Sequence, residues 1–228
     1  MCGRFVQLPL FSRTQAPWPE LADDLSGLSA KYNLAPTQRA AVILGAAGEL
    51  RVTKLRWGLI PSWVKDLKGS YSTINARIET IATKPAYRAA WKAPRRCLIP
   101  MAGYYEWREI GKVKQPYYIR RADHEHLYAA GLWEPRHALQ DADEDGSCTI
   151  ITHDAIDVAG QVHDRMPVFL DPAMAREWMA ASPDDAMAIL LAAPVPPLEV
   201  FPVSRDINSS RNRGGPESIE PAEPPPEQ

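Results

Sequence analysis

Short apolar segments, each about as long as a single strand, recur along this 228-residue chain and limit the folds open to it. Turn-forming Gly, Pro, Asn and Asp residues separate these segments, which is typical of β-strands joined by loops. We predict strands at Gly3–Leu8, Ala40–Leu44, Leu50–Leu55, Arg96–Ile99, Tyr104–Glu109, Tyr117–Arg120, Leu127–Leu132, Cys148–Thr152, Pro167–Leu170 and Leu198–Val203. The pattern indicates one α+β domain dominated by β-structure.

Helices are expected between some of these strands, and disorder at the end of the chain. The helical segments are predicted at Phe11–Ser29, Pro85–Trp91, Pro172–Met179 and Pro183–Ala192. From Gly214 on, the chain is rich in Pro and Glu and has too few apolar side chains to offset the entropy of ordering. We therefore predict a folded domain over residues 1–213 and a disordered tail over residues 214–228.

The formal net charge of −2 conceals an uneven distribution along the chain. Residues 1–121 hold 20 of the 26 Lys and Arg but only 8 of the 28 Asp and Glu, a net charge of +12, whereas residues 122–228 carry −14. A basic half is a typical footprint of a phosphate-bearing partner. Attraction between the two halves within one fold explains the same pattern, so charge alone leaves both interpretations open.

The composition is that of a soluble protein from a reducing compartment. The longest apolar stretches, such as Ala186–Val195, are far shorter than the roughly 20 residues that cross a bilayer. The first residues lack the apolar core and the cleavage pattern of a signal peptide. Three cysteines, Cys2, Cys97 and Cys148, cannot all pair in disulfides. We expect a cytoplasmic protein that does not associate with membranes.

No sequence signal indicates a metal or another cofactor. His124, His126 and His137 lie in a polar, acidic stretch without the spacing of a zinc site, and we expect them at the surface. The chain also lacks a nucleophile-elbow motif, a P-loop and a dinucleotide-binding glycine motif. We therefore expect neither a metal site nor a cofactor.

Cys2 is the side chain with the most distinctive chemistry. Methionine aminopeptidase removes Met1 when the second residue is small, which leaves an α-amine and a thiol on adjacent carbons. The amine, with an ordinary pKa of about 7.7–8.0, condenses with an aldehyde to a Schiff base. The thiol can then add to the imine carbon and close a five-membered thiazolidine ring, which no lysine could do. A buried, inert thiol is the alternative for such a cysteine.

Three further side chains are candidates for chemistry, although each also has an ordinary structural explanation. Asn75, in the segment Asn75–Glu79, can donate and accept hydrogen bonds, and Arg77 beside it suits a phosphate. Glu106 lies among aromatic residues, where lost hydration raises the pKa of a carboxyl and favours proton transfer. His163 precedes an apolar segment together with two charged residues. A turn Asn, an exposed strand Glu and a structural His are the alternatives.

Seven motifs in a fixed order resemble those of one family. They are Met1-Cys2-Gly3-Arg4-Phe5, Tyr32-Asn33-Leu34-Ala35-Pro36, Trp57-Gly58-Leu59-Ile60-Pro61, Asn75-Ala76-Arg77, Gly103-Tyr104-Tyr105-Glu106-Trp107, His163-Asp164-Arg165-Met166-Pro167 and Pro202-Val203-Ser204. From residue 1 to about residue 213 the chain resembles the SRAP family (SOS-response-associated peptidase), also called abasic-site processing proteins, in the compact form found in bacteria. The resemblance implies a β-rich domain of short, mostly antiparallel strands with a barrel-like core and a few flanking helices.

The resemblance implies a sensor of abasic sites in single-stranded DNA that crosslinks itself to the lesion. Cys2 would form a thiazolidine with the C1′ aldehyde of the ring-opened deoxyribose, and Asn75 would hold its α-amine. Glu106 would move protons during ring opening and imine formation. His163 would stabilise oxygen at the same carbon and assist reversal of the crosslink. The shielded lesion could not undergo strand-breaking elimination.

DNA contacts and partners follow from the same resemblance. The implied DNA-binding residues are Arg4 and Arg77 at phosphates, Thr152 at the sugar, and Pro36, Trp63 and Trp107 against neighbouring bases. The expected partner is single-stranded DNA with an abasic site, including 3′ junctions between single-stranded and duplex DNA. The protein would act as a monomer beside replication-fork proteins, at the nucleoid during DNA damage.

Two other functions remain open at this stage. Cys2, His163 and Asn75 would also make the Cys/His/Asn set of a thiol peptidase that acts on its own first residues, although a basic first half has no evident use in proteolysis. A single-strand binding module without chemistry is the third hypothesis. It leaves an N-terminal cysteine beside Glu and His motifs unexplained.

Overall fold

The computed structural model of the protein describes residues 2–9, 16–46, 48–65, 73–135, 137 and 145–225. The strands in these residues are β1 (Arg4–Gln7), β2 (Lys31–Leu34), β3 (Arg39–Ala46), β4 (Glu49–Trp57), β5 (Asn75–Arg77), β6 (Arg96–Met101), β7 (Gly103–Ile110), β8 (Val113–Arg121), β9 (Leu127–Pro135), β10 (Gly146–Asp154), β11 (Arg165–Pro167) and β12 (Leu198–Pro202). The helices are α1 (Ala22–Ser26), α2 (Arg88–Lys92), α3 (Asp157–Gly160), α4 (Pro172–Ala180), α5 (Pro183–Ala192) and the 3₁₀ helices η2 (Pro19–Leu21), η3 (Arg205–Asn208) and η4 (Pro216–Ile219).

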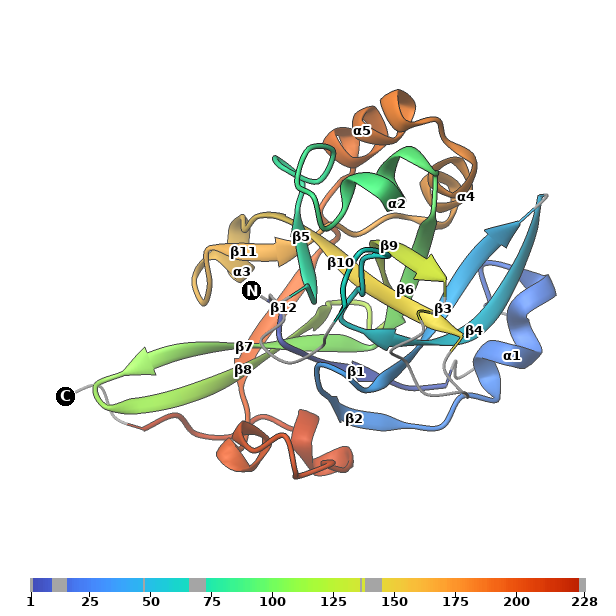
Figure 1. Cartoon of the computed structure of the whole chain (residues 1–228). Coiled ribbons are helices and arrows are strands. Elements are labelled where there is room, and N and C mark those ends of the chain that lie inside the picture. The colour runs from blue at the N-terminus through green and yellow to red at the C-terminus, as the bar shows by residue number, and fades with distance from the viewer. Residues whose placement is uncertain are drawn as a thin grey trace.

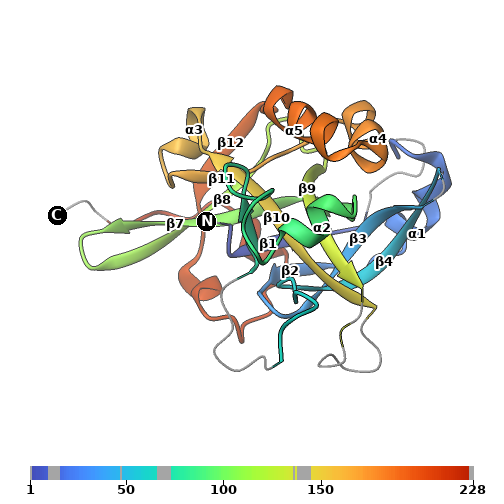
Figure 2. The same ribbon diagram turned by 45° about the horizontal axis from the view of Figure 1, so that its top comes forward.

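The strands form two sheets that cross in the middle of the molecule (Figures 1 and 2). The first sheet has the order β12–β8–β7–β1–β2 and is antiparallel throughout. The second has the order β11–β10–β4–β3–β6–β9, and β10 also pairs with β9, so that β10, β4, β3, β6 and β9 are hydrogen-bonded in a ring. Helices α2, α4 and α5 lie together at one end, while the β7–β8 hairpin extends away from the body (Figures 1 and 2). The predicted β-rich α+β class is confirmed.

Close packing of backbone and rings fixes how the two sheets meet. Phe5 of β1 packs edge-on against Trp57 of β4, with ring centroids 4.9 Å apart, and both side chains are fully buried. In the ring of strands, a Cβ on Gly131 would lie 2.5 Å from the Ile99 side chain and 2.6 Å from the Thr149 carbonyl oxygen. Only glycine therefore lets β6, β9 and β10 approach so closely. Among the described residues, no helix is long and apolar enough to cross a membrane.

Two predicted elements differ from those observed. The strand expected at Pro167–Leu170 is β11 up to Pro167, after which the chain forms one isolated bridge, between Phe169 and Ala129. Its backbone there bonds to both neighbours, because Val168 donates to Ile151 of β10 and accepts from Ala130 of β9. The long helix expected near the start is reduced to η2 and α1, since prolines interrupt it, and residues 10–15 lie outside the described part.

The structure describes the segment after Gly214, for which the sequence predicts disorder, as far as Pro225. This segment forms η4, in which Ser218 is buried and Ile219 packs against the small cluster around Tyr105. The N–H of Ala222 donates to the carbonyl oxygen of Pro202, the last residue of β12, at 2.9 Å. The segment thus lies against the end of the edge strand β12 and against the cluster around Tyr105. Residues 226–228 lie outside the described part.

Removal of residues 214–228 tests this packing. The truncated chain loses the apolar contact of Ile219 and the cover over Tyr105, so we expect its free energy of unfolding to fall by about 1–3 kcal/mol. Thermal unfolding followed by circular dichroism measures the difference. A chain ending at Pro225 is the matched control and should melt like the full chain. Equal melting temperatures for all three chains would show that the segment contributes nothing.

Candidate active site

The pairing of β1 with β7 brings Cys2 to the strand that carries Glu106. Phe5 lies opposite Tyr104 and Arg4 opposite Tyr105, so the residues before Arg4 run alongside those after Tyr105. The Cys2 side chain is fully buried, with its Sγ 3.9 Å from the Arg4 carbonyl oxygen. Burial raises the pKa of this thiol well above its ordinary value, and the charge of Glu106 raises it further. The free protein therefore holds Cys2 as a neutral thiol at pH 7.

Asn75, the first residue of β5, holds the backbone of Cys2. Its Nδ2 donates a hydrogen bond to the Cys2 carbonyl oxygen at 2.7 Å. The Tyr87 hydroxyl donates to the Asn75 carbonyl oxygen at 2.8 Å and secures the strand from the other side. The Oδ1 of Asn75 is buried and accepts no hydrogen bond from any described residue. An acceptor is thus left beside the backbone of residue 2, where an amine could donate to it.

Glu106 is 2% exposed and is poised to exchange protons near neutral pH. Burial raises the pKa of its carboxyl to about 7, and the positive charge of the amino terminus opposes the rise. The charged and neutral forms are therefore both populated at pH 7. A group in this condition can donate or accept a proton at little cost.

His163 lies between α3 and β11 on the same side of the site. Its Nδ1 lies 3.0 Å from the Arg165 backbone nitrogen, whose N–H donates to it when the ring is neutral and carries its proton on Nε2. Burial lowers the pKa of His163, and the charge of the neighbouring Asp164 acts on the carboxyl of Glu106. A protonated ring could instead bond to Asp164, whose Oδ1 is 2.7 Å from Nδ1.

Arg165 ties these elements into one frame. The guanidinium donates to both carboxylate oxygens of Glu79, at 2.7 and 3.0 Å, and to the Thr152 carbonyl oxygen at 2.7 Å. Glu79 follows the strand of Asn75, and His163 precedes Arg165 by two residues. One buried cation therefore joins the start of β11, just after His163, to β10 and to the segment that follows the strand of Asn75. The sequence motif contains Arg165 but gave no reason to assign it this role.

A pocket of about 200 Å³ opens beside Gly3, the residue after Cys2, and the buried Cys2 side chain does not line it. It is lined by Gly3, Arg4, Trp107, Lys114 and Asn208. The Arg4 guanidinium and the Lys114 ammonium lie 5.9 and 5.6 Å from the Trp107 ring, whose Nε1 donates to Asn208 at 2.7 Å. Two cations and an aromatic wall give this pocket the composition of a phosphate and base site. Sequence reasoning found Arg4 and Trp107 but missed Lys114 and Asn208, which lie outside the recognisable motifs.

The other predicted DNA-binding residues are placed differently. Arg77 is exposed on β5, two residues after Asn75. Thr152 is fully buried, and its hydroxyl is 3.5 Å from the Ala76 carbonyl oxygen, so it does not face solvent here. Trp63 is 54% exposed and Pro36 is half-buried. Within the described chain, no hydrogen bond, ion pair or ring contact joins Pro36 or Trp63 to Cys2, Asn75, Glu106 or His163.

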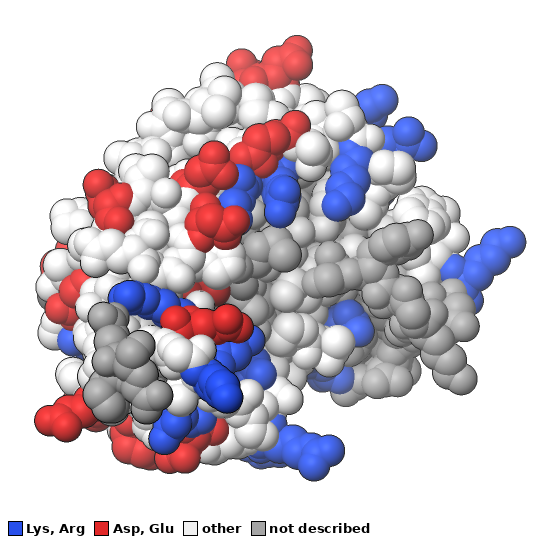
Figure 3. Space-filling view, turned by 90° about the vertical axis from the view of Figure 1, so that its left-hand side faces the viewer, with Lys and Arg blue, Asp and Glu red and all other residues white. Residues whose placement is uncertain are grey.

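Basic and acidic side chains both occur on the face that Figure 3 shows, which is the left-hand side of the molecule in Figure 1. Lys and Arg side chains occupy its right-hand part and lower centre, while Asp and Glu gather at the left and at the top (Figure 3). The basic half of the sequence therefore does not form a uniformly basic face here. A negatively charged strand would be guided by the local basic groups around the pocket rather than by the whole surface.

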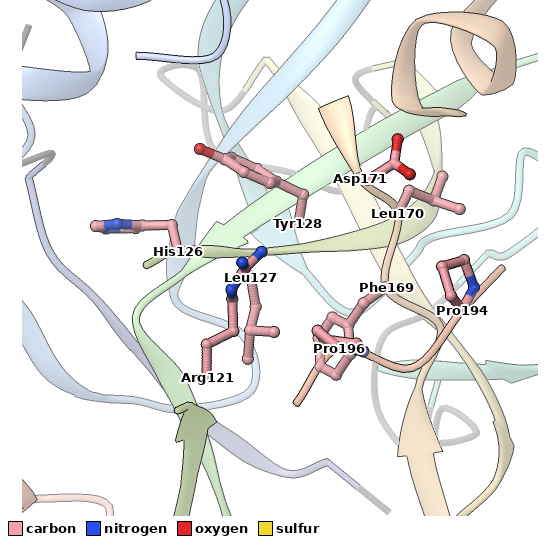
Figure 4. Close-up of a pocket in the computed structure, with 9 residues that line it drawn as sticks. All are labelled: Arg121, His126, Leu127, Tyr128, Phe169, Leu170, Asp171, Pro194 and Pro196. Carbon is pink, nitrogen blue, oxygen red and sulfur yellow. The ribbon is translucent and has the colours of Figure 1, made fainter. Parts of the chain in front are cut away.

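A second, smaller pocket of about 60 Å³ shares no lining residue with the first (Figure 4). Its lining includes Arg121, His126 and Tyr128 on one side and Phe169 and Pro196 on the other (Figure 4). The prediction that His126 lies at the surface is wrong, because it is 5% exposed and its Nε2 lies 3.2 Å from the Leu8 carbonyl oxygen. The pocket is large enough for ordered water but not for a nucleotide.

The same fold occurs in several solved structures. A protein of Bacteroides thetaiotaomicron superposes with a TM-score of 0.71 at 26% identity, over 89% of this chain and 90% of that one. A phage-related protein of Bordetella bronchiseptica gives a TM-score of 0.68 at 30% identity, over 90% and 95% of the two chains. These similarities show that the chain has the same fold as these solved structures.

The sequence profile of SOS response associated peptidase (SRAP) matches residues 1–210. The abasic site processing protein YoaM of Bacillus subtilis is 36% identical, over 93% of this chain and 95% of its own. The abasic site processing protein YedK of Escherichia coli is 30% identical, over 97% and 100%. The chain therefore belongs to the SRAP family, as its motifs predict.

Glu106 should make the stability of the protein depend on pH. Its carboxyl has a pKa of about 7 in the folded chain, against an ordinary value of 4.5. The protonated Glu106 carboxyl therefore stabilises the folded state. This stabilisation is complete below about pH 4.5 and is lost as the pH rises through 7. Glu106→Gln removes the charge. The free energy of unfolding of this variant, minus that of wild type, should therefore be about 2–3 kcal/mol larger at pH 8 than at pH 4.5. Urea unfolding at both pH values measures it, and a difference independent of pH would contradict it.

Proposed function

We propose that this protein recognises abasic sites in single-stranded DNA and joins itself to them covalently through Cys2. The observation that carries the proposal is the hydrogen bond from Asn75 to the Cys2 carbonyl, which fixes residue 2 in a site shared with Glu106 and His163. Membership of the SRAP family supports it, since the relatives YoaM and YedK are named abasic site processing proteins. The role belongs to the response to DNA damage.

The chemistry needs the amine as well as the sulfur of Cys2. Once Met1 is removed, the α-amine attacks the C1′ aldehyde of the open deoxyribose, and loss of water gives an imine. The thiol proton passes to the Glu106 carboxylate, and the sulfur bonds to C1′ while the π electrons of the protonated imine return to nitrogen. Overall, one aldehyde and one aminothiol give a thiazolidine and one water.

Each polar neighbour has a defined part in this sequence. The free Oδ1 of Asn75 accepts a hydrogen bond from the α-amine and orients its lone pair toward the lesion. Glu106, with a pKa near 7, protonates the departing oxygen and later receives the thiol proton. His163 donates from Nε2 to oxygen at C1′ and serves the reverse reaction when water attacks. Reversal would release the protein from DNA.

The pocket beside Gly3 receives the DNA adjacent to the lesion. Arg4 and Lys114 neutralise a flanking phosphate, and the Trp107 ring offers a face for a base. Arg77, on the exposed side of the Asn75 strand, contacts a second phosphate. We place Pro36 and Trp63 against neighbouring bases further along the strand. Such contacts suit a single strand, including the single-stranded side of a 3′ junction with duplex.

A covalent gel assay tests the proposal. Wild-type protein incubated with a single-stranded oligonucleotide that contains one abasic site should give a band that survives SDS. Cys2→Ala should give none, because it lacks the sulfur that closes the ring. Cys97→Ala removes another fully buried thiol and is the matched control, which should crosslink like wild type.

The same assay separates the alternatives. Absence of a covalent band with wild-type protein would overturn the proposal. Cleavage of a peptide substrate in its place would favour the thiol peptidase, although the raised pKa of the Cys2 thiol disfavours the thiolate that such a peptidase needs.

Blocking the removal of Met1 tests the requirement for the amine. A chain with a short uncleavable N-terminal extension keeps its thiol and its basic groups, but its residue-2 nitrogen becomes an amide. We expect crosslinking to be lost and the affinity for single-stranded DNA, measured by fluorescence anisotropy, to stay within about threefold, since phosphate contacts supply most of it. Normal crosslinking by the extended chain would rule out the thiazolidine.

A further inference from the structure

The Tyr104 hydroxyl is a buried polar group that the chemistry above does not use. The side chain is fully buried, and its oxygen has no hydrogen-bond partner among the described residues. The next residue, Tyr105, is equally buried, but its hydroxyl donates to the Tyr32 carbonyl oxygen at 2.8 Å. Because a buried hydroxyl without a partner destabilises the fold, such a group calls for an explanation.

Tyr104 lies in the part of the fold that holds Cys2 and Glu106. Tyr104 and Glu106 are two residues apart on β7 and project from the same face of the strand. Tyr104 also lies opposite Phe5 of β1 and belongs to the same buried cluster as Cys2. Phe169 packs against its ring, with centroids 6.0 Å apart, and limits its movement.

The protonation state of Tyr104 suits a donor. Burial raises the pKa of its hydroxyl well above the ordinary value, and the charges of Cys2 and Glu106 raise it further. The Tyr104 hydroxyl therefore keeps its proton at neutral pH. A neutral hydroxyl in this environment gains most by donating to a nearby negative charge.

We propose that the Tyr104 hydroxyl donates a hydrogen bond to the Cys2 sulfur whenever that sulfur carries negative charge. The inference rests on the proposed function and names a further group for its thiol step. When the thiol proton moves to Glu106, the sulfur becomes a thiolate in a buried site, and a donor stabilises it until the bond to C1′ forms. On reversal the C1′–S bond breaks as the nitrogen lone pair forms C=N, and the same donor stabilises the leaving sulfur. Tyr104 keeps its proton throughout.

This role separates the two stages of crosslinking. Imine formation uses the amine of Cys2 and develops no charge on sulfur, so it does not depend on Tyr104. Ring closure and ring opening pass through the same charged sulfur, so both depend on Tyr104. Loss of the hydroxyl should slow closure and opening by a similar factor and leave imine formation unchanged.

Tyr104→Phe tests the inference, because it removes one oxygen and keeps the ring. In the processed full-length protein, thiazolidine formation on abasic single-stranded DNA should slow by roughly tenfold or more, as should reversal, since a hydrogen bond to a charged group is lost. Imine trapped with cyanoborohydride should still form at the wild-type rate. The melting temperature should not fall, because the lost hydroxyl has no partner in the free protein.

Tyr105→Phe is the matched control on the neighbouring residue. It loses the hydrogen bond to Tyr32, so its melting temperature should fall while its ratio of thiazolidine to trapped imine stays that of wild type. Equal rates of ring closure in wild type and Tyr104→Phe would overturn the inference while leaving the proposed function intact. A parallel loss of trapped imine and thiazolidine in Tyr104→Phe would also overturn it. Absence of any crosslink with wild type would instead refute the proposed function.

Discussion

One hydrogen bond, from the Asn75 amide to the Cys2 carbonyl, joins the two sheets where the reacting groups meet. Cys2 leads into β1 of the first sheet, and Asn75 begins β5, which pairs with β10 of the second. The Tyr87 hydroxyl donates to the Asn75 carbonyl oxygen. The Arg165 guanidinium donates to the Thr152 carbonyl oxygen of β10, the strand next to β5. The first residues of a chain are usually free to move, and these contacts hold them in a fixed orientation. Every other part of the site is arranged around a terminus held in this way.

Burial then sets the chemistry of each group in that arrangement. It keeps the Cys2 thiol protonated, brings the pKa of the Glu106 carboxyl to about 7 and lowers that of His163. Glu106 can therefore take up and release a proton near neutral pH, which a sequence of additions and reversals at one carbon requires.

The sequence predicted the fold class and the family, because short alternating strands and compact motifs are local signals. The roles assigned to Cys2, Asn75, Glu106 and His163 stay predictions. The sequence did not predict the burial of His126, because the Leu8 carbonyl oxygen beside this ring lies 118 residues away in the chain. Lys114 and Asn208 were missed for the same reason, since only the fold brings them to Trp107.

Arg4 shows how distant segments prepare a binding group. Its guanidinium already donates to the Asn33 side chain and to the Ile207 carbonyl oxygen, while Asn33 itself donates to the carbonyl oxygen of Asn212. The entropy of ordering this arginine, roughly 0.5–1.5 kcal/mol for such a side chain, is lost during folding and not when a ligand arrives. If Arg4 binds DNA as proposed, residues near the end of the chain raise its affinity by preorganisation, without any need to contact the ligand themselves.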